Sequence, residues 1–449
     1  MLRHIAVGLI LLSLPASLAF AAPPKVVTST PDNGEIDVDP ATTEIRIEFD
    51  QPMHPRGRSV VGGGPSYPKI AGDLKWLPDG KTFVIPVTLE PEHDYQLNIN
   101  SDTFKGFQNP KNEPAEWYPI RFRTRAAGAA AAEPDVTPQQ NKDALAALVD
   151  AIDNDYGYRD RKKIDWSKEI EKRRAKLENA KSANEFARLT AHLLRLAEDA
   201  HVSVEVGDMS IATRTNSASP NFNYETLQKV VPNFKEHESG IVTGKFDDAG
   251  IGYILFSECS DQQAKGFDAA LDQLKDTKAL ILDARFNGGG DELAARQVAG
   301  RFIEKPAVYS KNRIRENGKW NGPFDRTVEP RKDVERYAKP VAVLIGPKVG
   351  SSAESFVLMM KHGANAKLIG AATKGSSGRP KPNQLGNGVT VYLSSWEDQL
   401  PDGTVLEGRG ARPDIIIKTN PGDFENGDPV VEAAVKFLRG SAGRAKAAQ

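Results

Sequence analysis

Hydrophobic and polar residues alternate along several stretches in the first part of the chain. In TEIRIEF (Thr43–Phe49) and TFVIPVTLE (Thr82–Glu90), every second residue is hydrophobic, so the hydrophobic residues of an extended chain would lie on one face. A period of two is typical of half-buried β-strands. Turn sequences such as TPDNGE and LPDGK separate these stretches. Roughly seven short strands within residues 23–125 therefore predict an all-β sandwich.

The pattern becomes helical further along the chain. Residues 126–142 contain few large hydrophobic residues and several alanines and prolines, which predicts a linker. Beyond it, hydrophobic residues recur three or four apart, as in Phe186, Leu189, Leu193 and Leu196. This spacing predicts helices with one side facing a core. We therefore assign residues 143–210 to a helical lead segment.

The second half of the chain alternates short, continuously hydrophobic runs with helical segments. The runs are GYILF (Gly252–Phe256), ALILD (Ala279–Asp283), VAVLI (Val341–Ile345) and KLIG (Lys367–Gly370). Such runs, separated by helices, are typical of buried parallel strands in βαβ units. Residues 211–440 are therefore predicted to form a wound α/β core, followed by a tail at residues 441–449.

Residues 1–22 have the pattern of a secretory signal peptide. Arg3 supplies the positive start, Ile5–Leu14 the hydrophobic stretch, and AFA (residues 19–21) a cleavage signal of small residues. The alternative, a membrane anchor, would need about 20 apolar residues, and Pro15 interrupts this shorter run. We therefore expect export to the periplasm or the extracellular space, without a membrane span.

Charge and cysteine content narrow the expected partners. Lys and Arg total 59 and Asp and Glu total 60, so the formal net charge is -1. This balance gives no electrostatic reason to expect nucleic acid as a partner. The one cysteine, Cys259, excludes an internal disulfide and is expected to be buried as a small hydrophobic residue. Asp153–Asp160 (DNDYGYRD) lacks the glycine and final glutamate of a calcium loop, so we expect neither a metal nor a cofactor.

Three junctions between strands and helices carry residues suited to chemistry. Sites in wound α/β folds gather where strands end. Gly288–Gly290 come soon after ALILD, Ser351 opens a helix after VAVLI, and His201 stands where a helix ends and a strand begins. Acyl transfer needs a hydroxyl, a base within hydrogen-bond reach and backbone donors for the oxyanion. These residues meet the requirements if the fold brings them together.

Each of these residues also has a purely structural interpretation. Ser351–Glu354 has the S-x-x-E form of a capping box, in which the serine oxygen accepts a backbone hydrogen bond and the glutamate reaches back. A glycine triplet after a strand is commonly a turn, although the chain contains none of the glycine-rich nucleotide-binding motifs. A single histidine is commonly a surface or core group. Spacing alone leaves both interpretations open.

Taken together, these segments resemble the tail-specific (C-terminal processing) serine protease family, in the branch similar to the tricorn core protease. The matching segments, in chain order, are KKIDWSKE, LAEDAHVSV, GIGYILFSE, LILDARFNGGG, GPKVGSSAESF, LIGAATKGSSGRP and LPDGTVLEGRGARPDI. Residues 23–125, which include STPDNGEIDVDP, resemble a bacterial Ig-like domain. The resemblance implies a wound βαβ (crotonase-like) protease core behind an Ig-like sandwich.

The resemblance also implies roles for five residues. Ser351 matches the nucleophile of the family, and His201 matches the general base of the tricorn-like branch. Glu407, in LEGRG, matches the acid that completes the charge network. The oxyanion hole would use the backbone N–H of Ser352 and one N–H from the glycine loop, that of Gly289.

Two positions depart from the family pattern. The branch with a serine–lysine dyad has its lysine where this chain has Ser376, and Lys374 stands two residues earlier, so a lysine base is the lesser alternative. The tricorn-like branch has a serine directly before its histidine, and here Ala200 takes that place. How the imidazole is oriented is therefore left open between Asp199 and Glu407.

Only about fifty residues separate His201 from Gly252, too few for the peptide-binding PDZ domain that most members of the family carry there. The resemblance thus implies an exported serine endopeptidase that acts on protein or peptide substrates through an acyl-enzyme. The alternative, favoured by Ala200, is a catalytically inactive binding or carrier module on the same scaffold. An envelope partner for the Ig-like domain is a further hypothesis.

Overall fold

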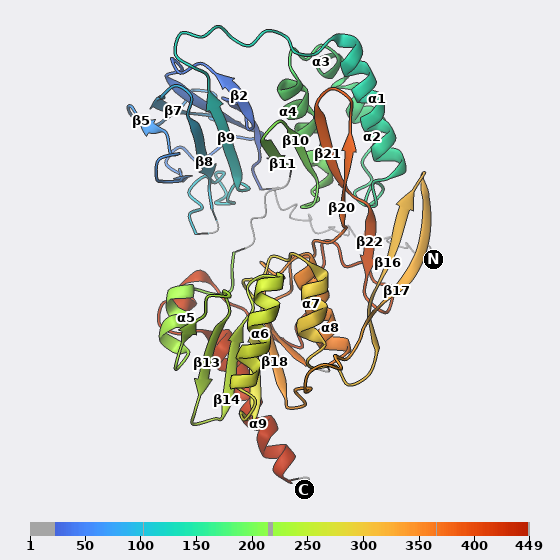
Figure 1. Ribbon diagram of the computed structural model, residues 1–449. Coiled ribbons are helices and arrows are strands. Elements are labelled where there is room, and N and C mark those ends of the chain that lie inside the picture. Colours follow the sequence, from blue (N-terminus) through green and yellow to red (C-terminus); the bar gives the residue numbers. More distant parts are fainter. Residues whose placement is uncertain (1–22, 102, 214–218, 365, 448–449) are drawn as a thin grey trace, which may run out of the picture.

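The computed structural model describes residues 23–101, 103–213, 219–364 and 366–447 (Figure 1). The predicted signal peptide lies outside these residues. In Figure 1 the N-terminal sandwich and the helical lead segment lie side by side in the upper half, and the α/β core forms the lower half. Helix α4 (Ala183–Leu194) contacts strand β2 (Glu35–Val38), which joins the first two parts.

The N-terminal part is a sandwich of two sheets, as the alternating pattern predicts. One sheet has the order β1-β3-β7-β5 with β6 also paired to β7, and the other has the order β2-β9-β8-β4. The hydrophobic sides of both sheets form one cluster that includes Ile47 and Phe122. The strands not yet delimited are β1 (Val26–Thr30), β3 (Glu44–Phe49), β4 (Val60–Val61), β5 (Lys69–Ile70), β6 (Lys75–Trp76), β7 (Thr82–Thr88), β8 (Asp94–Ile99) and β9 (Tyr118–Thr124).

The helical lead segment begins earlier than its sequence predicts. Helix α1 (Pro138–Asn154) starts inside residues 126–142, for which the composition predicts a linker. Thr137 accepts from the N–H of Gln140, and the Gln140 side chain bonds back to the backbone of Thr137, so a capping box with Pro138 at the first position starts the helix. The other helices are α2 (Trp166–Glu171), α3 (Arg174–Glu178), α4 and the 3₁₀ turn η1 (Arg195–Ala197).

A small sheet joins the lead segment to a distant part of the chain. Its order is β11-β10-β21-β20, in which β10 (Ser203–Val206) pairs with both β11 (Met209–Ala212) and β21 (Val389–Ser394). Strand β20 (Pro380–Gln384) completes the sheet. The predicted boundary between residues 210 and 211 is therefore wrong, because it divides β11. Pairing between strands so far apart in the chain leaves no local signal.

The α/β core is built on a sheet of order β12-β13-β14-β15-β18-β19-β23. Its strands from β14 to β23 are parallel, as the hydrophobic runs predict. The bounds are β12 (Lys235–Glu236), β13 (Val242–Phe246), β14 (Ile251–Leu255), β15 (Ala279–Asp283), β18 (Val341–Ile345), β19 (Lys367–Gly370) and β23 (Ile415–Ile416). A separate sheet of order β17-β16-β22 is made by β16 (Ala307–Glu316), β17 (Lys319–Val328) and β22 (Trp396–Gln399).

Helices cover both faces of the core sheet, which explains why its strands are hydrophobic throughout. In β15, Leu280 and Leu282 pack into a cluster with α6 (Asp261–Gln273), α7 (Glu292–Ala299) and α8 (Ser352–His362). Ile281, on the opposite face, packs with α5 (Tyr224–Val230) and α9 (Pro429–Ala447). The 3₁₀ turn η2 (Pro421–Phe424) precedes α9. Because α9 runs to Ala447, the predicted tail at residues 441–449 is helical over most of its length.

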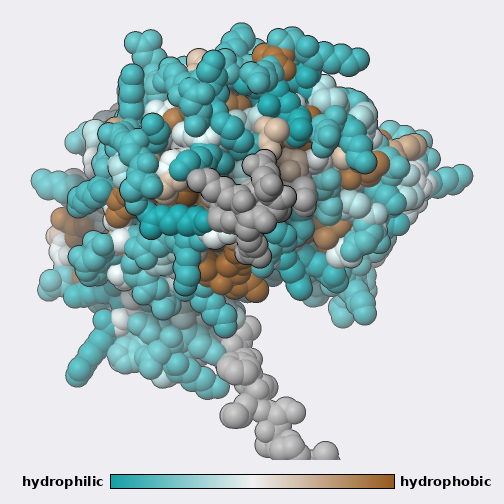
Figure 2. Space-filling view, turned by 90° about the horizontal axis from the view of Figure 1, so that it is seen from below, coloured by the Kyte–Doolittle hydropathy of each residue, from teal (hydrophilic) through white to brown (hydrophobic). Residues whose placement is uncertain are grey.

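Polar side chains dominate the face of the molecule seen in Figure 2, and hydrophobic side chains form small separate groups on it. The described part of the chain contains no helix that is both long and apolar enough to cross a membrane.

Candidate active site

Ser351 lies in a strained turn between the end of β18 and the start of α8. Its φ of 53° and ψ of -131° are those of the first central residue of a type II′ turn, a conformation that costs a residue with a side chain about 1–3 kcal/mol. The capping box, which the sequence left open as the alternative interpretation of Ser351–Glu354, does not form, because the Ser351 side chain makes no capping hydrogen bond. The hydroxyl is instead directed at a histidine from another part of the chain.

His201 approaches Ser351 from the far end of the lead segment. Its Nε2 lies 3.2 Å from Ser351 Oγ, within hydrogen-bond distance. The backbone N–H of His201 donates to Asp199 Oδ1 over 2.9 Å. Asp199 is almost fully buried, and its other oxygen accepts from the hydroxyls of Tyr156 and Ser394. Asp199 therefore fixes the backbone that carries the imidazole.

The second nitrogen of the imidazole contacts a serine that the family pattern does not supply. Ser376 Oγ lies 3.2 Å from His201 Nδ1. The N–H of Ser351 donates to the carbonyl of Ser376 over 2.8 Å, and the N–H of Lys374 donates to that of Val349. The segment around Ser376 is therefore paired with the turn that carries Ser351. Ala200 has no hydroxyl to offer the imidazole, and the hydroxyl that does contact it comes from Ser376 in a different loop.

Two buried carboxylates hold the loop of residues 375–377 in position. Glu354 accepts from the N–H groups of Gly375 and Ser376, each over 2.8 Å. Glu407 accepts from the N–H of Ser377, also over 2.8 Å. The glutamate of the apparent capping box is thus used in tertiary structure and not in its own helix. The S-x-x-E pattern thus marks a real hydrogen-bonding role for Glu354, but its partners lie in another loop and not at the start of α8.

Gly375 is the position where this loop requires glycine. Its φ is +63°, and an added Cβ would lie 2.6 Å from the backbone nitrogens of Arg409 and Gly410. Real Cβ atoms do not approach backbone nitrogen so closely, so a side chain here would push the loop away from the segment after Glu407. The close approach explains how Glu407 reaches the loop that carries Ser376.

The imidazole is surrounded by opposing charges. Burial is the main cause that lowers the pKa of His201 below its ordinary value of 6.5, and the positive charge of Lys374 lowers this pKa further, against the charge of Asp199. His201 is therefore neutral at pH 7. With a proton on Nδ1 donated to Ser376, Nε2 is free to accept the proton of Ser351.

Burial raises the pKa of the two carboxyl groups, Glu354 and Glu407, whereas it lowers the pKa of His201. It raises the pKa of Glu354 to about 7. Burial, together with the charge of Asp199, raises the pKa of Glu407 to about 8, although Arg161 lies 3.7 Å from Glu407 Oε1. Glu407 thus reaches the histidine through the loop of Ser376 and Ser377, and its acceptor role there does not depend on a negative charge.

Replacing Glu407 by Gln is expected to change how stability depends on pH. The pKa of Glu407 in the folded chain, about 8, lies above the ordinary value of 4.5, so the folded state holds this proton more tightly. Its contribution to the free energy of unfolding is therefore complete below about pH 4.5 and is lost as the pH rises towards 8, by up to about 1.4 kcal/mol per pH unit.

Because glutamine does not ionise, Glu407→Gln should become more stable relative to the wild type between pH 5 and 8. Urea unfolding at pH 5, 6, 7 and 8 measures this difference, with the exposed Glu335→Gln as the control. Equal pH slopes for the wild type and Glu407→Gln would contradict the expectation.

The predicted oxyanion donors lie beside Ser351. A Cβ added to Gly289 would be 2.8 Å from Ser351 Cβ and 3.2 Å from Ser352 N, so the glycine loop packs directly against the turn. The N–H of Gly289 donates to Asn287 Oδ1 over 3.0 Å, so this donor is engaged within its own loop. Ser352 Oγ donates to the carbonyl of Gly290 over 2.7 Å. The roles of Gly289 and Ser352 stay predictions.

Cys259 and Lys374, the two other reactive side chains singled out from the sequence, are both located by the structure. Cys259 is buried, as predicted, and burial raises the pKa of its thiol to about 12, far from a reactive thiolate. Lys374 lies beside the turn, with its Cδ 3.1 Å from the position of a Cβ on Gly350. Within the described residues, no group of three or more metal-ligating side chains could hold a metal ion.

The chain matches known families over both of its main parts. The profile of the peptidase family S41 matches residues 250–417, a span that contains Ser351 and Glu407. The chain therefore carries a peptidase family S41 domain. The profile of a bacterial Ig-like domain matches residues 21–124. His201 lies before the span matched to family S41, so its assignment depends on the resemblance and on its contacts with Ser351 and Ser376.

Two curated relatives support the family assignment. The carboxy-terminal processing protease CtpB of Bacillus subtilis is 25% identical over 170 residues, which cover 37% of this chain and 34% of that protein. A CtpA-like serine protease of Staphylococcus aureus is 28% identical over 173 residues, which cover 38% of this chain and 34% of that protein. This chain thus spans about a third of the length of the curated relatives that it matches.

A solved structure shares the fold of the S41 part. A crystal structure from Parabacteroides merdae, of a protein assigned to the peptidases, covers 68% of this chain and 97% of its own, with a TM-score of 0.59 and 23% identity. The predicted family and the predicted combination of a mixed α/β core with an Ig-like sandwich are confirmed. The S41 domain belongs to a family of serine-type peptidases.

Proposed function

We propose that this protein is an exported serine endopeptidase in which Ser351 is the nucleophile and His201 the general base. The observation that carries the proposal is the distance of 3.2 Å between Ser351 Oγ and His201 Nε2, inside a domain of a serine-type peptidase family. The strained backbone of Ser351 supports it as well, because strain of this kind is concentrated at functional sites.

The reaction proceeds through an acyl-enzyme. Ser351 Oγ forms a bond to the carbonyl carbon of the scissile peptide while its proton passes to His201 Nε2. The C–N bond then breaks, and the same proton is transferred to the leaving amine. A water molecule next adds to the acyl carbon and gives a proton to His201. The bond to Ser351 Oγ breaks, the proton returns to this oxygen, and the free carboxylic acid product is released.

Backbone amides stabilise the negative charge on the carbonyl oxygen in this proposal. The N–H of Ser352 is well placed by its position in the first turn of α8, where the helix dipole adds positive potential. The second donor comes from the glycine loop. For Gly289 to take this role, its N–H has to leave Asn287 Oδ1 when substrate binds.

The position of the imidazole is maintained from three directions. Ser376 accepts from Nδ1, Asp199 holds the backbone N–H, and Glu354 and Glu407 keep the loop of Ser376 in place. Ser376 is a positioning residue in this mechanism, since it acts on the substrate through His201 alone.

Replacing Ser376 by Ala should lower kcat while changing KM little. Loss of one hydrogen bond to a buried imidazole costs about 1–3 kcal/mol, which corresponds to a decrease of roughly 5–150-fold. Ser376→Thr keeps the hydroxyl and should restore most of the activity. Steady-state kinetics on a fluorogenic peptide measure both variants. If Ser376→Ala and Ser376→Thr were equally impaired, the loss would be due to packing and not to the hydrogen bond.

Export to the periplasm or extracellular space remains part of the proposal, since residues 1–22 have the pattern of a signal peptide. A signal peptide removed near Ala21 would leave a mature chain that begins at the Ig-like domain. Amino-terminal sequencing of the protein from a culture that expresses the full chain tests this part.

A fluorophosphonate probe tests the proposed nucleophile directly. An activated serine forms a covalent bond with such a probe, and mass spectrometry of the digested protein identifies the modified residue. We expect labelling at Ser351, and no labelling of the Ser351→Ala variant. Absence of labelling in the folded wild type, together with uptake of apolar ligands, would instead support the binding or carrier module. Ala200 favours this alternative because it lacks the hydroxyl of the family's bridging serine. That argument is weaker here, since the hydroxyl of Ser376 contacts the imidazole.

A further inference from the structure

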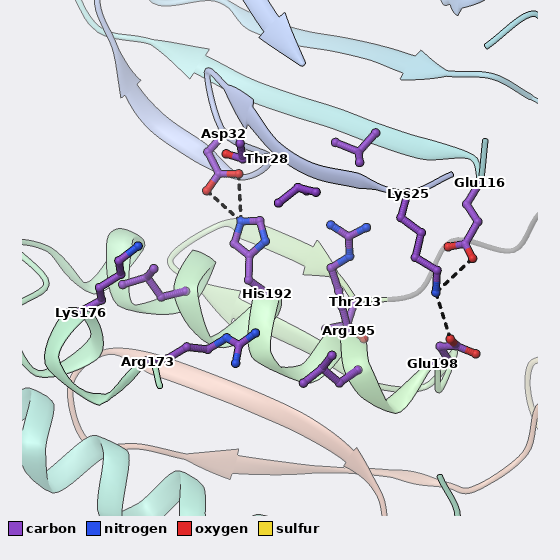
Figure 3. A pocket seen from close by; sticks show the side chains of 14 residues that line it. Lys25, Thr28, Asp32, Glu116, Arg173, Lys176, His192, Arg195, Glu198 and Thr213 are labelled. Carbon is purple, nitrogen blue, oxygen red and sulfur yellow. Dashed lines mark hydrogen bonds and ion pairs between the residues drawn. The ribbon is translucent and has the colours of Figure 1, made fainter. Parts of the chain in front are cut away.

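A cavity of about 740 Å³ lies between the Ig-like sandwich and the helical lead segment (Figure 3). One wall comes from the start of β1 and the turn after it. The opposite wall comes from α3, α4 and η1. The lining combines charged side chains with the hydrophobic side chains of Val27, Leu189 and Leu196. The cavity is thus formed by two domains, and its surface suits a chain that carries both apolar and charged groups.

The carboxylates in the wall of this cavity are already paired. Lys25 Nζ lies 3.2 Å from Glu116 and 3.3 Å from Glu198, and so connects the sandwich to the lead segment. Figure 3 shows Lys25 between these two side chains. Asp32 lies 2.8 Å from a nitrogen of Arg188. The negative charge in the wall is therefore compensated.

Two cations in the wall have no acidic partner within the described part of the chain. Lys176 is an exposed residue of α3. Arg195 lies over the ring of Tyr118 at 4.5 Å, an interaction that leaves its positive charge uncompensated. Figure 3 shows the guanidinium of Arg195 directed towards β1, into the space between the two domains. An anionic ligand is the group that these two residues would attract.

The segment that lines the cavity at Arg195 and Glu198 continues along the chain into the residues that position His201. Arg195 opens the 3₁₀ turn η1, and Glu198 follows that turn with a φ of 48°. The next residue, Asp199, accepts the backbone N–H of His201. A ligand bound to Arg195 would therefore contact the same short segment that positions the imidazole.

We propose that this cavity binds an acidic segment of the polypeptide substrate, with Arg195 and Lys176 contacting its carboxylates. The proposal rests on the proposed peptidase function. The size of the cavity, its two separated cations and its hydrophobic side chains fit a peptide better than a single small anion. Bound in this way, the substrate contacts both the Ig-like domain and the segment before His201, so the sandwich takes part in substrate selection.

Binding is tested separately from catalysis with the full chain carrying Ser351→Ala. Fluorescence anisotropy of labelled hexaglutamate, with labelled hexaglutamine for comparison, measures the affinity. We expect hexaglutamate alone to bind, with an affinity that falls as the salt concentration rises. Adding Lys176→Gln or Arg195→Gln should each weaken binding by about fivefold, the effect of losing one exposed or half-exposed ion pair.

Matched controls come from the exposed surface of the α/β core. Lys332→Gln and Arg336→Gln remove the same charges far from the lining residues and should leave the affinity unchanged. Because Lys176 is exposed, its replacement does not endanger the fold. Equal affinities for all four variants, or no binding of hexaglutamate, would overturn the proposal. So would full displacement of the peptide by inorganic phosphate at an equal concentration, which would define a site for small anions.

Kinetics on the wild type complete the test. A fluorogenic peptide with a glutamate tail beyond its scissile bond should have a KM at least about fivefold lower than the same peptide with a glutamine tail, and Lys176→Gln should reduce this difference. If the wild type cleaved no peptide while hexaglutamate still bound through Arg195, the peptidase function would be wrong and the binding site would stand. Cleavage without any preference for the acidic tail would support the peptidase function and overturn the proposed peptide-binding role of the cavity.

Discussion

Replacing Ser351 by Ala should abolish peptide cleavage while leaving the stability of the protein unchanged. The rate should fall by roughly 10⁴–10⁶-fold, the loss seen when the nucleophile of a serine peptidase is removed. The free energy of unfolding should not fall by the ~1 kcal/mol that removal of a helix cap costs, because the Ser351 side chain does not cap α8. Hydrolysis of a fluorogenic peptide and urea unfolding measure the two effects.

Ser260 provides a matched control for this experiment. It stands at the start of α6, and its side chain does accept the N–H of Gln263. Ser260→Ala should therefore lose about 1 kcal/mol of stability and keep its activity, the opposite of the result for Ser351→Ala. Full activity of Ser351→Ala would disprove the proposed nucleophile, whatever the stability of the variant.

Replacing His201 by Gln should lower kcat/KM by roughly 10⁴-fold, because Ser351 then has no base within hydrogen-bond distance. Lys374→Met should retain activity within about tenfold, since His201 and not Lys374 is the base in the proposed mechanism. Its removal should raise the pKa of His201, because burial and the charge of Lys374 both lower that pKa. The acid limb of the pH profile of kcat/KM should accordingly move to higher pH.

His201→Gln and Lys374→Met together distinguish between His201 and Lys374 as the general base. If Lys374 were the base, Lys374→Met would be inactive and His201→Gln would retain most of its activity. Melting temperatures measured beside the kinetics show whether either variant is folded. An acid limb that stays in place in Lys374→Met would contradict the electrostatic effect of Lys374 without affecting the assignment of His201.

The predicted strands of the α/β core agree with the structure to within about one residue at each end. GYILF, ALILD, VAVLI and KLIG correspond to β14, β15, β18 and β19. Burial on both faces leaves a continuous hydrophobic run, which is a local property of the sequence. The burial of Cys259 likewise follows from a local property, the small hydrophobic side chain of cysteine. The start of α1 differs from the predicted linker boundary, although its signal, Thr137 followed by Pro138 and Gln140, is also local.

The function of S-x-x-E at residues 351–354 could not be read from its spacing. A capping box and a catalytic turn share this pattern, and they differ in the backbone angles of Ser351 and in the partner of Glu354. The backbone angles of Ser351 and the partners of Glu354 both depend on contacts with the loop of residues 373–377, which follows β19 in the chain. Ser376, whose hydroxyl contacts the imidazole, likewise belongs to this loop.

The sequence by itself determined the family, the hydrophobic strands and helices, and the identity of Ser351, His201 and Glu407 as candidates. Only the tertiary structure decided that Ser376 faces the imidazole, that Glu354 and Glu407 hold the loop, and that two domains enclose a cationic cavity. The physical reason is separation along the chain: Ser351 follows His201 at a distance of 150 positions, and Ser376 follows it at a distance of 175 positions. Local periodicity specifies which side of an element is buried, whereas contacts over such separations depend on how the strands pair.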